Sequence, residues 1–275
     1  MIRIALISLT LFLGFPPIYA QSPSSDAQRL TDQCIEMMRQ GEYQKALELV
    51  NQAIEIDGKN VFALRTRGGL LAMFQYFKPA LKDFSKAIKL DPGNSLSFYN
   101  RGTCYQNMGK YSKAVKDFDR SIELNPEFKS AYANRGLAWC ELKNYDQALN
   151  DYKKAIELDE EYELAYRLRG LLHKDMKSYE EAIADFKQLL KLNPENHEAH
   201  FMIAGVHMDS GKYLYAIESY NQAIELAPEE MSPYLLMRGN AKKNINDLDG
   251  ACADWNKAYN LGLSIAKLLI DESCP

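Results

Sequence analysis

Few side chains in this sequence have the type and spacing that metal binding requires. The four histidines are His173, His197, His200 and His207, and the last two, seven residues apart, would share one face of a helix. No cysteine or carboxylate accompanies them at the ligand spacing of a zinc site. We therefore predict no metal site, and we interpret the histidines as packing residues.

Sequence motifs that perform enzymatic chemistry are also missing. The chain contains no GxSxG nucleophile elbow, no glycine-rich phosphate loop and no HExxH motif. Its formal net charge of −4 at pH 7 argues against nucleic-acid binding, which needs a basic face to neutralise phosphates. We predict a protein that is not an enzyme, uses no cofactor and binds no nucleic acid.

The chain is organised by a segment of 34 residues that recurs at a constant interval. Residues 95–128 align without gaps with residues 61–94 and 129–162. If each unit is numbered from 1 to 34, starting at Ser95, small residues fall at positions 8 and 20, which are Gly102 and Ala114 here. A period of this length is typical of solenoid proteins, in which each repeat packs on its neighbours.

The apolar spacing within a unit predicts two helices joined by a short turn. Phe98, Gly102 and Tyr105 recur at helical spacing, and a second helical pattern begins after Gly109. This second helix must end before Pro126, because proline cannot continue a helix. One such hairpin cannot bury its own aromatic side chains, so it needs a neighbour on each side.

The residue types at fixed positions resemble those of the tetratricopeptide repeat family, whose signature has Gly at position 8, Ala at 20, an aromatic residue at 24 and Pro at 32. Alanine occupies position 20 in all seven units that can be aligned, aromatic residues dominate position 24, and proline closes four units. The alanines are Ala46, Ala80, Ala114, Ala148, Ala182, Ala216 and Ala251, and the prolines are Pro92, Pro126, Pro194 and Pro228. The resemblance implies an all-α fold, a tetratricopeptide-type α-solenoid in which helix-turn-helix repeats form a right-handed superhelix.

The first 20 residues have a different character. Arg3 precedes an apolar run over residues 4–15, two prolines interrupt it, and Ala20 leads into a polar stretch, which is the layout of a secretory signal peptide. The run is shorter than the ~20 residues that a membrane-spanning helix needs. We predict a signal peptide over residues 1–20 and an exported protein, periplasmic or extracellular, with an uncleaved anchor as the alternative.

The remaining boundaries follow the repeat. We expect a polar leader over residues 21–26, seven tetratricopeptide-like repeats over residues 27–265 and a lone capping helix over residues 266–275. A cap is expected because the last internal face of a solenoid would otherwise be exposed.

Arginine recurs at position 7 of the unit and aspartate at position 23. If each second helix packs antiparallel against the first helix of the next unit, these residues should form ion pairs between units, 18 residues apart. Such pairs would oppose a slipped register. The predicted pairs are Asp83 with Arg101, Asp117 with Arg135 and Asp151 with Arg169. The alternative is that the arginines bind an acidic ligand.

Cys252 and Cys274 are candidates for a disulfide. An exported chain reaches an oxidising compartment, where disulfides persist. In the antiparallel register described above, Cys252 faces a residue about 22 positions further along the chain, which is where Cys274 lies. The alternative is a pair of free thiols buried as small hydrophobic groups, which is our interpretation of Cys34, Cys104 and Cys140.

The resemblance further implies an inner groove lined by the first helix of each unit, chiefly at positions 2, 5, 6, 9, 12 and 13. Units three and four would place polar residues there, including Asn100 and Asn134, whereas units five and six would place apolar residues with Arg167 and Lys174 nearby. Solvent-facing apolar side chains mark an interaction site, unless the curvature of the repeats buries part of this face. The apolar contact residues predicted are Leu164, Leu168, Leu171, Phe201, Met202 and Met208, and we expect Phe201 and Met202 to play no part in packing.

These inferences predict a non-enzymatic scaffold that acts outside the cytoplasm and binds a peptide or protein segment in its concave groove. A clamp for a chaperone C-terminal carboxylate, which some family members carry, is disfavoured because Gly69 stands where asparagine is expected. The alternative function is an envelope or extracellular carbohydrate-binding component, with Tyr99, Tyr132 and Trp139 as stacking candidates.

Overall fold

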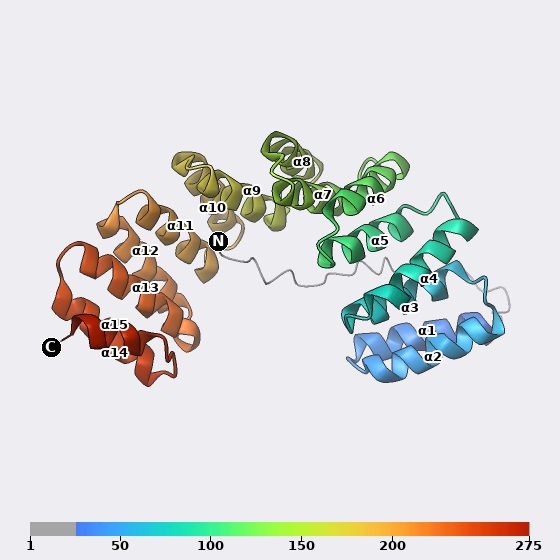
Figure 1. Cartoon of the computed structure of the whole chain (residues 1–275), viewed down its shortest axis with the longest axis horizontal. Helices are drawn as coiled ribbons and strands as arrows, with labels where there is room; N and C mark the ends of the chain where they lie inside the picture. Colours follow the sequence, from blue (N-terminus) through green and yellow to red (C-terminus); the bar gives the residue numbers. More distant parts are fainter. Residues whose placement is uncertain (1–25, 275) are drawn as a thin grey trace. The chain divides into compact units, whose positions relative to one another are not determined.

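The computed structural model describes residues 26–274. The predicted signal peptide, and the polar leader apart from Asp26, lie outside the described residues. Within them the chain forms fifteen α-helices, one short 3-10 helix and no strand, which confirms the predicted all-α repeat fold (Figure 1). No helix of this part of the chain is long and apolar enough to cross a membrane. The α-helices are α1 (Asp26–Arg39), α2 (Tyr43–Ile56), α3 (Val61–Met73), α4 (Phe77–Leu90), α5 (Ser95–Asn107), α6 (Tyr111–Leu124), α7 (Lys129–Glu141), α8 (Tyr145–Leu158), α9 (Glu163–Asp175), α10 (Tyr179–Leu192), α11 (His197–Asp209), α12 (Tyr213–Leu226), α13 (Met231–Asn244), α14 (Leu248–Asn260) and α15 (Ala266–Ser273), and the 3-10 helix covers Pro228–Glu230.

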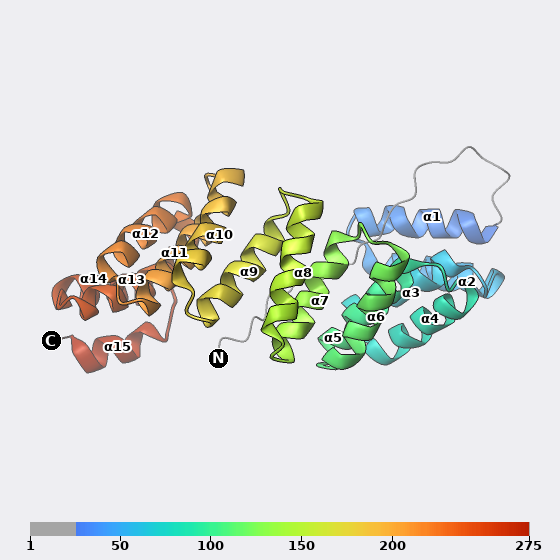
Figure 2. The ribbon, with the colours of Figure 1, turned by 90° about the horizontal axis from the view of Figure 1, so that it is seen from above.

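Consecutive helices pair as hairpins, and within each of the two compact units of the chain neighbouring hairpins pack on one another (Figure 2). The chain divides into two compact units, the first ending at Asp151 and the second beginning at Tyr152, within α8. In the first unit the hairpins stack through α2 on α3, α4 on α5 and α6 on α7. In the second unit α10 packs on α11 and α12 on α13, and α15 covers α14.

The turn inside each hairpin depends on one residue with a left-handed backbone. After α5 this residue is Gly109, with a φ of 70°. The amide of Lys110 donates to the carbonyl of Tyr105 at 2.8 Å, and the amide of Gly109 donates to the carbonyl of Gln106 at 2.9 Å. This is a Schellman cap, which satisfies the free carbonyls at a helix end. Gln75 adopts a similar φ of 63° after α3 without being glycine.

The residues between two hairpins end the last helix of one hairpin and cap the first helix of the next. Helix α6 ends at Leu124, two residues before Pro126. The side chain of Asn94 accepts a hydrogen bond from the amide three residues further on, at 3.0 Å, and so caps the N-terminus of α5. Asn60 and Asn196 cap α3 and α11 in the same way. An asparagine at position 34 therefore marks where each of these hairpins begins.

The core consists of clusters distributed along the repeats, and its tightest contacts lie within the hairpins. A Cβ atom added to Gly102 would lie 2.8 Å from the ring of Phe118 and 3.3 Å from the carbonyl oxygen of Ala114. The small residues at positions 8 and 20 thus let the two helices approach, as predicted. The ring at position 24 is almost completely buried in six hairpins, at Phe84, Phe118, Tyr152, Phe186, Tyr220 and Trp255.

The recurring arginines and aspartates pair within hairpins, which corrects the prediction of pairs between units. Arg101 donates from Nε and Nη2 to the carboxylate of Asp117, at 2.8 and 2.7 Å, and its Nη1 donates to Ser85 of the preceding hairpin at 3.2 Å. The arginine at position 7 therefore pairs with the aspartate at position 23 of its own hairpin, sixteen residues later. In the preceding hairpin, the same arginine contacts the residue at position 25. The other pairs are Arg67 with Asp83, Arg135 with Asp151, Arg169 with Asp185, and Arg238 with Asp254.

Candidate functional site

Three of the predicted contact residues come together in the second unit. Leu164 and Arg167 on α9 and Met202 on α11 line a small cleft with a volume of about 90 Å³. The cleft is completed by Glu163, Leu189, Asn196 and Glu198. Pockets that enclose small-molecule ligands usually measure about 300–1,000 Å³. This cleft therefore suits a single side chain of a larger partner better than a small-molecule ligand.

The basic residues predicted beside the groove already have acidic neighbours. Arg167 lies 3.5 Å from Glu198, and Lys174 lies 2.8 Å from Asp209, so each of these cations on α9 pairs with a carboxylate on α11. Glu163 adds a second carboxylate to the lining of the cleft. A purely acidic segment would be repelled by these carboxylates, so the charges favour a partner segment that is itself mixed in charge or polar.

Part of the predicted apolar surface is used for packing. The ring of Phe201 lies 5.0 Å from that of Tyr234 and 5.8 Å from that of Tyr220, measured between centroids. Met208 packs against the same cluster. Leu168 is only 7% exposed. The expectations that Phe201 plays no part in packing and that Leu168 faces solvent are therefore wrong, because the first helix of the next hairpin covers this part of α11 and the core covers Leu168.

The apolar side chains that both line the cleft and keep solvent contact are Leu164 and Met202. Each is half-buried. Met202 and Leu171 also touch the cluster around Phe186, so the expectation that Met202 plays no part in packing is wrong as well. A thioether side chain can adapt its shape, so Met202 suits a surface that receives another chain.

The first unit carries a different set of buried polar groups on its first helices. Asn100 on α5 is 1% exposed, and neither atom of its side-chain amide has a hydrogen-bond partner among the described residues. Asn134 on α7 donates to the hydroxyl of Tyr99 at 2.8 Å. Arg65 on α3, a residue that sequence analysis missed, is 4% exposed and its Nε has no partner in the described part of the chain. Burial lowers the pKa of the Arg65 guanidinium, although the carboxylate of Asp91 opposes this shift.

Buried polar groups without partners are uncommon, because each costs about 1–3 kcal/mol of desolvation. The inner helices of the first unit are therefore a second candidate surface, with a polar character. The signal in the sequence that could have found Arg65 is its place at position 5, one of the groove positions.

The aromatic residues considered for sugar stacking lie in the core of the first unit. Tyr99 is 2% exposed and Tyr132 is 9% exposed. Trp139 packs against the cluster around Phe118. Tyr99 and Tyr132 are too buried to serve as stacking platforms, and Trp139 is half-buried, so the carbohydrate alternative gains no support from them.

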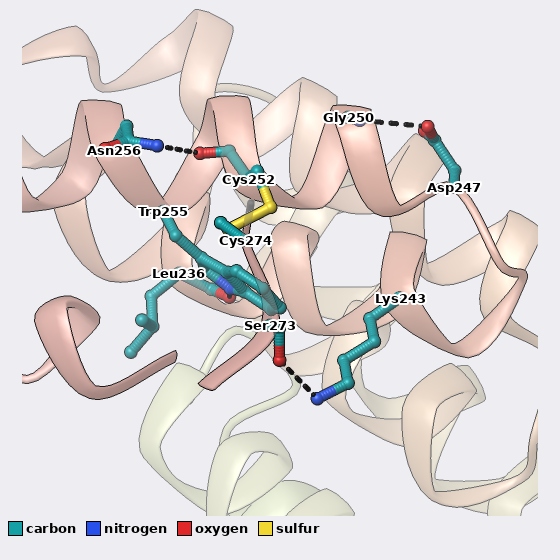
Figure 3. Close-up of a disulfide and its surroundings, with 9 residues drawn as sticks. All are labelled: Leu236, Lys243, Asp247, Gly250, Cys252, Trp255, Asn256, Ser273 and Cys274. Atoms are coloured by element: carbon teal, nitrogen blue, oxygen red, sulfur yellow. Dashed lines mark hydrogen bonds between the residues drawn. A yellow bond between two sulfur atoms is a disulfide. The ribbon is translucent and has the colours of Figure 1, made fainter. Parts of the chain in front are cut away.

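The two predicted disulfide partners lie at bonding distance. The structure contains a disulfide between Cys252 on α14 and Cys274 after α15, with Cα atoms 5.8 Å apart (Figure 3). Lys243 Nζ donates to Ser273 Oγ at 2.9 Å beside it. The bond therefore ties the last helix to the last hairpin.

Cys34 and Cys104 are free thiols. Burial raises the pKa of the thiols of Cys34 and Cys104 to about 12 each, so neither is a thiolate at neutral pH. The thiolate is the reactive form of cysteine, and these two side chains therefore behave as small apolar groups.

The histidines do not assemble into a metal centre. Within residues 26–274 no group of three or more histidine, cysteine or acidic side chains could hold a metal ion. His197 Nδ1 shares a hydrogen bond of 2.7 Å with the hydroxyl of Tyr234. Burial lowers the pKa of His200 and of His207.

Comparison with known proteins gives one family and several similar folds. Models of the tetratricopeptide repeat match residues 95–128, 130–162 and 167–230. No curated protein matches the sequence. A tetratricopeptide repeat protein from Parabacteroides merdae ATCC 43184 is similar in structure, with a TM-score of 0.68, 22% identity, and coverage of 92% of this chain and 100% of that one.

Two further solved structures share the fold. PilW, a widely conserved type IV pilus biogenesis factor, has a TM-score of 0.71 and 17% identity, covering 77% of this chain and 99% of its own. YrrB, described as a repeat protein of the same kind with an unusual peptide-binding site, has a TM-score of 0.53 and 21% identity, covering 66% and 94%. Identities this low support the shared fold and say nothing about a shared partner.

Proposed function

Because the chain is a tetratricopeptide repeat protein, we propose that it is a non-enzymatic scaffold that acts outside the cytoplasm and binds a protein or peptide segment on the first helices of its hairpins. Repeats of this family indicate protein–protein interaction, and the similar protein YrrB is described as having a peptide-binding site. The observation that carries the proposal is the cleft between α9 and α11, where Leu164 and Met202 stay half-buried beside the pair formed by Arg167 and Glu198.

The proposed contact places one side chain of the partner in this cleft. Its volume of about 90 Å³ suits one apolar side chain between Leu164 and Met202. The rim carries both charge signs, so polar groups flanking that side chain can pair with Arg167 or with Glu163 and Glu198. A few buried anchors usually dominate the energy of such an interface, and rim charges mainly affect the rate of association.

Two features support the proposed location outside the cytoplasm. One is the predicted signal peptide over residues 1–20. The other is the disulfide between Cys252 and Cys274, since such bonds persist in oxidising compartments and are rare in the cytosol.

Affinity capture from the native envelope with the mature chain tests the proposal. Replacing Leu164 and Met202 together by serine should reduce recovery of the partner about tenfold or more, because both sides of the cleft lose their apolar surface. The matched control replaces Leu214 and Tyr215 by serine. These two residues on α12 are 69% and 60% exposed and lie outside the cleft.

Thermal melting must show that both double variants are folded before capture is compared. If the cleft variant recovers every partner at wild-type levels, while Asn100→Ala with Asn134→Ala abolishes capture, the partner binds the first unit and the cleft is not the site. If none of these variants changes capture, the first helices do not form the binding surface and the proposal is wrong.

A further inference from the structure

The C-terminal end of the described chain presents an unusual number of exposed apolar side chains. Tyr259, Leu261, Ile265 and Leu268 are 42%, 51%, 56% and 63% exposed. The last three follow one another at intervals of four and three residues, through the turn that precedes α15 and into that helix. Contiguous exposed apolar side chains rimmed by polar groups usually mark an interaction site.

Helix α15 holds this face in a defined place. Ala266 is fully buried on one side of the helix, and Leu269 and Ile270 pack against the cluster around Trp255. The disulfide at Cys274 then ties the end of the helix to α14 (Figure 3). Because the inner side is anchored in this way, Ile265 and Leu268 cannot turn into the core and remain directed to solvent.

The opposite end of the described repeats is built differently. The exposed residues of α1 and of the turn that follows it, up to residue 40, are all polar: Asp26, Arg29, Asp32, Gln33, Glu36, Arg39 and Gln40. Solenoid ends normally show a polar outer face, which keeps the stack soluble and stops it from growing. Helix α1 follows this rule and α15 does not. A second copy therefore presents no fully exposed apolar side chain on α1 to receive α15, which disfavours head-to-tail stacking on that helix.

The charges on α15 are complementary to those of an identical helix in the opposite direction. Lys267 lies near its start, whereas Asp271 and Glu272 lie near its end, and Lys267 and Asp271 form an ion pair along the exposed surface. In an antiparallel pair centred near Leu268, the lysine of each copy comes within about one helical turn of the acidic end of the other. A parallel pair would instead bring like charges together.

We propose that the outer face of α15 is a self-association surface, through which two copies of this protein pair about a two-fold axis. In this pairing Leu268 packs near the axis, Leu261 and Ile265 surround it, and Lys267 faces the acidic end of the partner helix. Two-fold pairs that use the same patch on both subunits are the commonest form of homo-oligomer. A stable interface usually buries about 800 Å² on each partner, more than four half-exposed side chains provide, so this dimer is weak and depends on concentration.

Sedimentation equilibrium of the mature, disulfide-bonded protein tests this proposal. The weight-average molar mass should rise from the mass of a monomer at about 5 μM protein toward that of a dimer at several hundred μM. Such a dependence is expected for a contact smaller than a stable interface. Leu268→Asp should keep the protein at one chain over this range. Leu214→Asp is the matched control, because Leu214 is 69% exposed and lies on α12, away from this face, so its dimerisation should equal that of the wild type.

Charge reversal tests the arrangement of the two copies. Lys267→Asp should weaken the dimer, and adding Asp271→Lys should restore it, since the exchanged charges remain complementary in an antiparallel pair. Hydrogen exchange of residues 266–273 shows whether α15 is still folded in each variant, and the resistance of Cys252 and Cys274 to alkylation shows that the disulfide is intact. The proposal is overturned if the wild-type protein is monomeric at every concentration. It is also overturned if the Leu268→Asp variant dimerises as strongly as the wild type. Failure of the double exchange to restore the dimer overturns the two-fold arrangement.

Discussion

Arg135 and Asp151 lie opposite each other across a single hairpin. The Nε and Nη2 groups of the arginine donate to the two carboxylate oxygens at 2.9 and 2.6 Å. The remaining nitrogen, Nη1, donates to Asp119 of the preceding hairpin at 2.7 Å. One guanidinium thus closes its own hairpin and connects it to the previous one. The same bidentate geometry links Arg101 to Asp117.

The first prediction concerns removal of one partner of such a pair. Asp117→Ala should lower the free energy of unfolding by about 2–3 kcal/mol, because it leaves the guanidinium of Arg101 without its acceptor. The cost should lie below that of a fully buried pair, since the Arg101 side chain is 21% exposed. Urea denaturation followed by circular dichroism measures it. The double variant with Arg101→Leu and Asp117→Leu should cost less than Asp117→Ala, and a larger loss in the double variant would contradict this account.

The second prediction compares two glycines on neighbouring first helices. A Cβ atom at Gly170 would meet the ring of Phe186 at 2.5 Å, whereas one at Gly205 would meet only the side chain of Lys174, at 3.6 Å. Gly170→Ala should therefore destabilise the protein by about 1–3 kcal/mol through overpacking. Gly205→Ala should be neutral or stabilise it by up to ~1 kcal/mol, because alanine favours helix. Equal melting temperatures for the two variants would show that position 8 is not a close contact.

The repeat predicted most of the fold because its constraints recur. At Gly68, Gly102, Gly170 and Gly239 an added Cβ atom would lie less than 3 Å from the ring at position 24 of the same hairpin, so the pairing of Gly102 with Phe118 can be read from the sequence. The sequence does not determine the partners in the ion pairs to the same degree. The sequence offers Arg101 two aspartates at comparable separations, Asp83 and Asp117, and only the geometry of the hairpin decides that Asp117 is the partner.

The candidate site was predictable only in part, because exposure depends on neighbouring hairpins. Positions 5 and 6 face the inner side in the family pattern, yet Phe201 at position 5 is covered by Tyr234 from the next first helix. Leu168 at position 6 is buried as well. Sequence analysis left open that part of this face is buried. It placed Leu164 and Met202 among the groove residues of two first helices, but it did not predict the cleft that they share.

The third prediction is a pH dependence of stability that comes from two histidines. Burial lowers the pKa of His200, and burial together with the positive charges of Lys212 and Lys187 lowers that of His207, whereas Glu218 opposes the shift. Below the unfolded value of about 6.5, the unfolded chain then binds more protons than the folded one. The stability contributed by these side chains is therefore complete above about pH 6.5 and is lost as the pH falls through their lower folded values.

Urea midpoints measured between about pH 5 and pH 7.5, at constant ionic strength, check this dependence. The variant with His200→Gln and His207→Gln should lose less stability over this interval than the wild type does, because glutamine does not titrate. Carboxylates contribute equally to both proteins and cancel in the difference. Parallel curves for the two proteins would contradict the assignment.

The last prediction concerns the bond between Cys252 and Cys274. A disulfide stabilises a fold mainly by restricting the unfolded chain, and a loop of 22 residues corresponds to ~3 kcal/mol. Reduction by a dithiol, which converts the bond to two thiols as the reagent becomes a disulfide, should therefore lower the stability of the last hairpin and of α15. Hydrogen exchange of residues 248–273 measures the loss, because unfolding here can be local. Cys252→Ser should show the same loss, and the reductant should have no further effect on it, whereas Cys140→Ser should still respond to reductant like the wild type. If Cys252 and Cys274 are separately alkylated in protein isolated from its native compartment, the bond does not form there, and α15 is held by packing, chiefly that of Ala266, Leu269 and Ile270.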